Sequence, residues 1–169
     1  MDLTGGPPRR LYKAEVYTTQ FLLTGEIEPR GKLLDDLNSA DRGYIFIHPA
    51  SITPLTPDCV LGTFSRDKIV VDKRDTIAIY LTDEAARAEI GLLRKEERVI
   101  VYPPAFILRA TFHLGEEMRT RDMFDAIMST FVPISQVSLF PLYPLRSQIP
   151  QRRELLLLNK SQVIFYHTE

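Results

Sequence analysis

The sequence has a single cysteine and no long apolar run, and each of these absences removes a class of protein. Cys59 has no partner for an intrachain disulfide, which fits a reducing compartment. No apolar stretch reaches the roughly 20 residues that a membrane-spanning helix needs. Residues 1–6 (MDLTGG) lack the charged and then apolar pattern of a signal peptide. We therefore expect a cytoplasmic protein without a membrane span.

The chain also lacks an excess of charge of either sign, because 21 lysine and arginine residues stand against 22 aspartate and glutamate residues. Binding to nucleic acid through many phosphates normally uses a basic stripe, and the sequence contains none. Its 44% hydrophobic and 25% charged residues are typical of a globular protein. At 169 residues the chain is long enough to bury a self-sufficient core.

Residue types that carry catalysis or bind metals are few and scattered. His48, His113 and His167 lack the spacing of metal ligands, and we interpret them as structural or surface residues. Nothing near Cys59 in the sequence supplies the base that a nucleophilic thiol needs, so an inert thiol is expected. We predict no catalytic residue, no metal site, no cofactor and no enzymatic activity.

What the sequence does contain is an internal repeat. The matching blocks are 15–28 with 100–113, 33–39 with 123–129, 44–57 with 131–144, and 66–77 with 153–164. The clearest match sets ASITPLTP over VSLFPLYP, at an offset of 87 residues. The offset changes only in the loops that flank the second block, and such loops tolerate insertions. The pattern indicates a tandem duplication of one unit.

Each copy begins with an alternating pattern that is typical of half-buried strands. In the first copy these strands flank residues 18–20, whose counterpart is Pro103-Pro104-Ala105. Because a Pro-Pro pair does not fit inside a central ladder, we expect a turn and a hairpin there. Gly25 marks either a bulge or a close approach of another backbone segment.

A short helix is expected next in each copy. Residues 33–37 and 123–128 both place apolar side chains at i, i+1 and i+4, which is the spacing of one helix face. Asp122 is positioned to cap the second of these helices. With about two turns each, the helices need tertiary contacts to persist.

Three further strands complete the unit, in the order β-β-α-β-β-β. Residues 44–55 read as a strand broken at His48-Pro49. Residues 68–71 and 76–80 flank the polar segment 72–75 and predict a second hairpin, with residues 159–162 as the counterpart turn.

The predicted fold class is mainly β (α+β). It consists of two tandem repeats of a small, strongly bent, five-stranded antiparallel sheet or barrel with a short helix, joined by a linker helix. Residues 1–10 form a tail, 11–82 the first unit, and 99–169 the second unit. Between them, residues 83–98 are rich in helix formers with acids at the start, and we expect a linker helix of about three turns there.

The stretch 21–27 (FLLTGEI) looks like the first motif of the Sm-like small-barrel family, and residues 68–79 look like its closing hairpin. The resemblance covers most of each copy and implies five short, bent strands. It differs in placing the helix after the second strand instead of before the first. The turns at 37–39 and 72–75 lack the Asp-x-Asn and Arg-Gly residues that contact RNA in that family, so RNA binding is not implied. The strand and turn pattern is also similar to a group of uncharacterised bacterial proteins with one such unit, which imply no activity.

The second copy is more apolar than the first. Its candidate interface residues are Phe140, Tyr143, Leu155, Leu157 and Phe165. A strand that is apolar on both faces is either covered twice or exposed to a partner. The two alternatives are packing of the second copy on the first copy or linker helix, and an external protein interface.

The leading hypothesis is therefore a non-enzymatic protein-interaction or scaffold module, a pseudo-dimeric tandem that docks into a larger assembly with a protein partner or with copies of itself. The alternative is an Sm-like protein that binds single-stranded nucleic acid (RNA), which the neutral charge disfavours. In that alternative the stacking residues are Tyr17, Phe21, Tyr102 and Phe106, and the phosphate contacts are Arg30, Arg74, Arg152 and Arg153. A third class, an enzyme or small-ligand sensor, needs a pocket between the copies.

Overall fold

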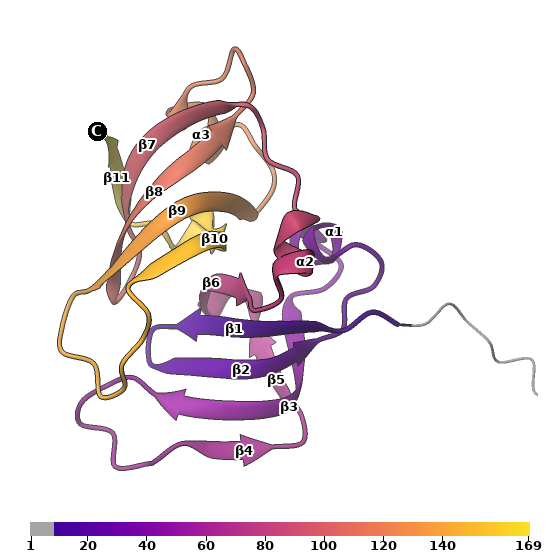
Figure 1. The fold of residues 1–169 in the computed structure, drawn as a ribbon, viewed down its shortest axis with the longest axis vertical. Helices are drawn as coiled ribbons and strands as arrows, with labels where there is room; N and C mark the ends of the chain where they lie inside the picture. Colours follow the sequence, from indigo (N-terminus) through magenta and orange to yellow (C-terminus); the bar gives the residue numbers. More distant parts are fainter. Residues whose placement is uncertain (1–8) are drawn as a thin grey trace, which may run out of the picture.

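A computed structural model describes residues 9–169, and most of the regular structure in them is β-strand (Figure 1). The strands are β1 (Tyr12–Thr18), β2 (Phe21–Ile27), β3 (Tyr44–Pro54), β4 (Phe64–Arg66), β5 (Ile69–Asp72), β6 (Thr76–Leu81), β7 (Lys95–Tyr102), β8 (Phe106–Leu114), β9 (Phe131–Pro141), β10 (Arg152–Asn159) and β11 (Phe165–Thr168). The helices are α1 (Leu33–Asn38), α2 (Glu84–Ala88) and α3 (Thr120–Asp125), with two 3₁₀ turns, η1 (Lys73–Asp75) and η2 (Lys160–Gln162). The prediction of a mainly β protein is confirmed. Of the predicted tail, residues 1–8 lie outside the described part of the chain.

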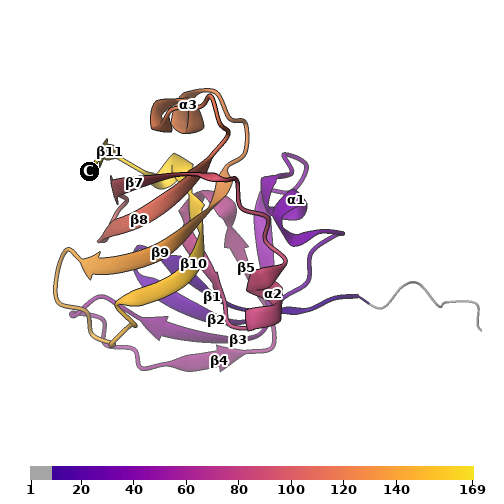
Figure 2. The same cartoon turned by 45° about the horizontal axis from the view of Figure 1, so that its top comes forward.

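The strands of residues 9–169 form one large, open, antiparallel sheet. Its order is β11-β7-β8-β9-β10-β6-β1-β2-β3-β4, and β5 pairs with β3 beside β4. The sheet curls so that strands β7 to β11 lie over strands β1 to β6 (Figures 1 and 2). A single strand pair, β6 with β10, joins these two groups of strands: Leu157 lies opposite Ile79, and Leu158 lies opposite Ala78. We refer to this pair and the side chains around it as the junction.

We call β1 to β6 the first side of the junction and β7 to β11 the second side. The strand registers on the two sides correspond at the offsets of the sequence repeat. The paired residues, given for the first side and then the second, are Val16–Leu23 and Val101–Leu108, Phe21–Pro54 and Phe106–Pro141, Tyr44–Asp72 and Phe131–Asn159, and Tyr17–Ala78 and Tyr102–Phe165. The register shift between Thr24 and Glu26 also recurs, between Arg109 and Thr111.

Gly25 has the two properties expected from the sequence. It lies at the register shift between β2 and β3, and a Cβ atom on it would lie 2.3 Å from the carbonyl oxygen of Pro49 and 2.5 Å from Cγ2 of Ile47. The same shift explains why the predicted break of the strand at His48-Pro49 is wrong. Strand β3 continues through this cis peptide bond because Pro49 falls where the ladder with β2 is interrupted and needs no N–H donor from it.

The predicted hairpin around residues 72–75 is also wrong. β5 pairs with β3, whereas β6 pairs with β1 and β10, so the two strands separate at the 3₁₀ turn η1. β10 and β11 separate in the same way at η2, because β11 pairs with β7. Almost every residue of β6 is buried, and a strand that is apolar on both faces is most stable in the interior of a sheet.

The expected linker helix is much shorter than its predicted range. α2 ends at Ala88, and β7 already begins at Lys95. Residues 95–98 alternate between half-buried and exposed positions, because their pairing with β8 overrides their propensity for helix. Asp122 does cap α3, but from its third position, where its carboxylate accepts a 2.8 Å hydrogen bond from the Arg119 N–H.

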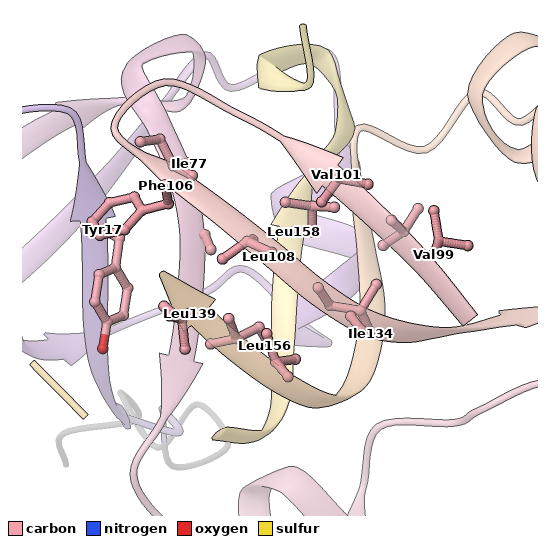
Figure 3. Packing of buried hydrophobic residues seen from close by; sticks show 14 of the residues in the cluster. Tyr17, Ile77, Val99, Val101, Phe106, Leu108, Ile134, Leu139, Leu156 and Leu158 are labelled. Atoms are coloured by element: carbon pink, nitrogen blue, oxygen red, sulfur yellow. The ribbon is translucent and has the colours of Figure 1, made fainter. Parts of the chain in front are cut away.

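The core is shared across the junction. One cluster consists mainly of side chains from β7 to β10 but includes Tyr17, Leu55, Ile77 and Ala78 from the first side (Figure 3). The other cluster consists mainly of side chains from β1 to β6 but includes Phe131, Leu155 and Leu157 from the second side. The core of each side is therefore completed by side chains from the other side.

Candidate interaction surface

The junction is the strand pair between the two sides, and its residues are covered where those of a free sheet edge are not. Ile79 and Leu157 are completely buried, and Asn159 is buried as well. The Asn159 side-chain amide donates hydrogen bonds to the carbonyl oxygens of Lys73 (2.9 Å) and Thr76 (2.8 Å). Apolar burial thus stabilises the junction, and a fully bonded amide fixes its register.

A polar cluster lies beside the apolar junction. Tyr17 contacts Phe106 edge to face, with 6.2 Å between the ring centroids, and its hydroxyl donates a 2.8 Å hydrogen bond to Glu15. Arg153 donates to Glu15 and to the Tyr17 hydroxyl, and its guanidinium lies 4.0 Å from the centroid of the Tyr80 ring. Burial, together with the charge of Glu15, raises the pKa of Tyr17, so the phenol stays protonated and serves as a hydrogen-bond donor.

Loops close the junction at one end. The backbone N–H of Arg146 donates to Leu55 O at 2.9 Å, and its guanidinium donates to the carbonyl oxygens of Cys59 and Leu61. The Tyr143 hydroxyl donates to Thr19 O at 3.1 Å. The loop after β9 is therefore held against the first side.

The two ends of the sheet contrast with the junction. Among the described residues, no strand pairs with the outer edge of β11 or with the outer edge of β5. Ile164 is 70% exposed and Phe165 56% exposed near β11, and Val70 is 60% exposed on β5. Their counterparts at the junction, at the offset of 87 residues, are Ile77, Ala78 and Leu157, which are 1%, 2% and 0% exposed. We call the first of these ends the β11 edge and the second the β5 edge.

A hollow of about 470 Å³ runs along the β5 edge. Its lining residues come from β5, from the turn between β1 and β2, and from the start of β2: Thr18, Thr19, Gln20, Phe21, Leu23, Ile69, Val70, Val71, Asp72 and Asp75. The lining includes the apolar side chains of Phe21 and Val70 and the carboxylates of Asp72 and Asp75.

The interface residues proposed from sequence divide into two groups. Phe140 and Phe165 are exposed, at 48% and 56%, whereas Tyr143 is half-buried against the core. Leu155 and Leu157 are buried at 6% and 0% exposure within the junction, so they are not available to an external partner. Their apolar character serves the packing of β10 against β1 to β6.

Val70 and Ile164 are exposed apolar residues that are not among the interface residues predicted from the sequence. A comparison of equivalent positions in the repeat could have found them, because both align with residues that are apolar in the other copy, Leu157 and Ile77. That comparison could not have shown which residue of each equivalent pair is buried and which is exposed.

Half of the eight candidate nucleic-acid contacts are buried or paired with an acidic residue of the protein. Tyr17 and Phe106 are each 1% exposed, so their rings are not available to stack on bases. Arg74 pairs with Asp72 at 2.8 Å, and Arg153 pairs with Glu15. The remaining candidates are Phe21 and Tyr102, which are half-buried, and Arg30 and Arg152, which are exposed.

The histidines have structural partners or lie at the surface. Buried His113 bonds to Ser135 Oγ at 2.8 Å and to Leu93 O at 3.1 Å through its two ring nitrogens. His48 lies 3.5 Å from Glu28, and His167 bonds to the Tyr102 hydroxyl at 3.1 Å. Within residues 9–169 no group of three or more His, Cys, Asp or Glu side chains is arranged to hold a metal ion. The helices in this part of the chain are all too short or too polar to cross a membrane.

Comparison with known proteins adds no family assignment, since no protein-family model, no curated protein and no solved structure matches the chain.

Proposed function

We propose that the chain is a non-enzymatic interaction module, a tandem duplication of one β-rich unit that joins a larger protein assembly through the two free edges of its sheet. The proposal includes a relationship of each unit to the Sm-like small barrel in its pattern of strands and turns. It does not include RNA binding.

The correspondence of strand registers supports the duplication. Two unrelated halves have no reason to share the pairs Phe21–Pro54 and Phe106–Pro141, or to place a register shift at the same point of the second strand. The turns η1 and η2 support it as well, because Lys73 and Lys160 both donate to carbonyl oxygens at the end of the preceding short helix.

The observation that carries the proposed interaction is the difference in burial between equivalent positions. Ile77 is 1% exposed at the junction, whereas Ile164 is 70% exposed at the β11 edge. Leu157 is 0% exposed at the junction, whereas Val70 is 60% exposed at the β5 edge. Unpaired edges with exposed apolar side chains are sites where another polypeptide adds a strand, because they offer both backbone hydrogen bonds and apolar area.

The test uses two substitutions of equally exposed apolar residues. Phe165 at the β11 edge is 56% exposed and Leu142 in the loop after β9 is 55% exposed. Immobilised wild-type chain and both variants, Phe165→Glu and Leu142→Glu, are incubated with an extract of the cells that produce the protein. We expect the wild type and Leu142→Glu to retain the same protein and Phe165→Glu to lose it. Equal capture by all three, or no capture together with a monomeric purified chain, would contradict the proposal.

A further inference from the structure

We infer that the occupant of each free edge is a second copy of this chain, so that the β5 edge of one molecule pairs with the β11 edge of the next. This inference rests on the proposed function and names its partner. It predicts a head-to-tail assembly in which every contact between molecules repeats the junction found within one molecule.

The junction is the template because its two sides are different surfaces. β10 contributes one edge and β6 contributes the other, so the contact is heterologous. Each of two like units has both kinds of edge, and a heterologous contact uses one kind from each unit. One edge of each kind therefore remains free. The unused equivalent of β10 is β5 with β4, and the unused equivalent of β6 is β11.

The register of the contact between molecules follows from the junction. Leu157 opposite Ile79 translates, at the offset of 87 residues, to Val70 opposite Tyr166. In the same way, Leu158 opposite Ala78 translates to Val71 opposite Phe165 of the next molecule. These positions include the exposed Val70 and Phe165, which the contact would bury.

The aromatic residues at the two edges correspond to an aromatic pair at the junction. At the junction, Tyr17 from the first side contacts Phe106 of the second. The equivalent residues are Tyr102, which stacks on Phe165 with 4.1 Å between ring centroids beside the β11 edge, and Phe21, which lines the hollow at the β5 edge. In the contact between molecules, the aromatic pair Tyr102–Phe165 of one edge would thus meet the hollow that Phe21 lines at the other edge.

One position differs between the two contacts and makes the contact between molecules weaker than the junction. Where Asn159 donates to Lys73 O and Thr76 O, the β5 edge has Asp72, which accepts hydrogen bonds from Arg74. The hydrogen bonds from Arg74 also lower the pKa of Asp72, so its carboxylate is ionised and has no proton to donate to a carbonyl oxygen of the next molecule. The inference therefore predicts an assembly that dissociates on dilution and that Asp72→Asn strengthens.

The first experiment tests the direction of pairing with the full-length chain. Two variants are made in a Cys59→Ser background, one with Val70→Cys and one with Tyr166→Cys. Residues directly opposite each other in an antiparallel pair come close enough for a disulfide. We expect a disulfide-linked dimer when the two variants are mixed under oxidising conditions, and none from either variant alone. Dimers formed by one variant alone would mean that identical edges pair and would overturn the inference.

The second experiment measures association of the purified chain by sedimentation velocity over a range of concentrations, and it does not depend on how well the cysteine variants fold. We expect the average mass of the wild type and of Leu142→Glu to rise with concentration in the same way. Phe165→Glu should weaken association by about tenfold or more, and Asp72→Asn should strengthen it by about tenfold. A wild type that stays monomeric at all concentrations overturns the inference.

The two proposals fail separately. If the purified chain is monomeric while a partner in the extract binds wild type but not Phe165→Glu, the β11 edge is an interaction surface for another protein, and only the self-assembly is wrong. If no binding in either experiment depends on Phe165, the proposed function fails as well.

Discussion

At the scale of single residues, Asn159 and Asp72 occupy equivalent positions, one buried at the junction and one at the free β5 edge. They differ in that Asn159 has an amide and Asp72 a carboxylate. Asn159 is the last residue of β10 and Asp72 is the last residue of β5, and each accepts a hydrogen bond from the backbone N–H two residues ahead. Only Asn159 also has donors for the two carbonyl oxygens of Lys73 and Thr76, and it is 0% exposed. A buried carbonyl without a donor costs free energy, so the amide is required where the junction covers this position.

Asn159→Asp is therefore predicted to lower the free energy of unfolding by about 2–4 kcal/mol at neutral pH, because it removes both donors and buries a charge. Chemical denaturation followed by circular dichroism measures this. Gln162→Glu is the matched control, since the Gln162 amide also donates across the junction, to Arg74 O, but from a partly exposed position. We expect the control to lose less than half as much, and equal losses would argue against the role of Asn159.

Gly25 carries a second prediction at this scale. Gly25→Ala places a methyl group 2.3 Å from Pro49 O, so the backbone must move, and we expect a loss of about 1–3 kcal/mol in the free energy of unfolding. Gly43→Ala is the control, because nothing lies within 4 Å of a Cβ atom there. Its stability should stay within about 0.5 kcal/mol of the wild type. If both variants unfold at the same denaturant concentration, the close approach at Gly25 is unimportant.

The sequence could predict the special place of Gly25 but not that of Asn159. A glycine inside an alternating strand pattern is itself a signal of a bulge or close approach. An asparagine in a polar turn is ordinary, and what makes Asn159 structural is a pair of carbonyl oxygens 86 and 83 residues away in the chain. Burial by a distant segment leaves no mark on the local pattern.

At the scale of elements, the short helices α1 and α3 are bonded to lysines from the 3₁₀ turns that follow β5 and β10. Nζ of Lys73 donates to Asp36 O at 2.7 Å and to Ser39 O at 3.3 Å, and Lys160 does the same for Met123 O (2.8 Å) and Ile127 O. The carbonyl groups at a helix end have no partner within the helix, and a cation there is favoured by the helix dipole. The lysines therefore tie α1 and α3 to η1 and η2.

Lys73→Met is predicted to cost about 1–3 kcal/mol in the free energy of unfolding, because it leaves two carbonyl oxygens without a donor. Lys13→Met, at an exposed position of β1, is the control and should change stability by less than about 0.5 kcal/mol. Hydrogen exchange of the α1 amides should accelerate in Lys73→Met and not in the control. Unchanged exchange in α1 would show that the lysine does not hold this helix.

The pH dependence of the same variant has a definite sign. Burial lowers the pKa of Lys73 below its ordinary value of 10.5, against the opposing effect of Asp36. Between the lowered pKa and 10.5 the unfolded chain binds more protons than the folded chain, so the wild type gains stability as the pH rises through this window. Lys73→Met lacks this gain, and the stability difference between the two proteins should widen with pH.

Sequence patterns predict the elements well where their partners are local and poorly where they are not. Alternation located β1, β2, β8 and the second half of β7, and the turns between them, because each forms a hairpin with its neighbour in sequence. The first half of β7, residues 95–98, falls instead in the range predicted for the linker helix. It failed for β5 and β6, which read as a hairpin but pair with β3, β1 and β10. A polar turn between two apolar strands shows that the chain turns, but it does not show which strand lies beside each of them.

At the scale of the whole molecule, the repeat predicts two similar units but not the way they join. The signal for joining was present as the four consecutive leucines of β10, whose apolar character on both faces requires a cover on each side. In the structure β6 pairs with one edge of β10, and each face of β10 packs into one of the two core clusters. The same apolar pattern is expected for a covered strand and for an exposed interface. Only the structure shows that Leu157 is buried at the junction whereas Phe165 is exposed at the free edge.

The shared core leads to the last prediction, that neither half of the chain folds alone. A fragment of residues 1–82 lacks Phe131, Leu155 and Leu157, and it exposes both edges of its part of the sheet. A fragment of residues 83–169 lacks Tyr17 and Ile77, which cover Phe106 and its neighbours (Figure 3). Each fragment would leave exposed the apolar area that stabilises the fold, and a chain of roughly 80 residues has little stability in reserve.

We expect each fragment by itself to show no cooperative urea transition, an equimolar mixture to regain one, and the intact chain to unfold in a single step seen alike by circular dichroism and tyrosine fluorescence. Leu157→Ala in the second fragment should abolish the recovery on mixing, because it removes the residue opposite Ile79 at the centre of the junction. Leu142→Ala, in the exposed loop after β9, is the control and should leave the recovery intact. If either fragment alone unfolds cooperatively with a midpoint close to that of the intact chain, the two units are independent domains, and the junction then only tethers them.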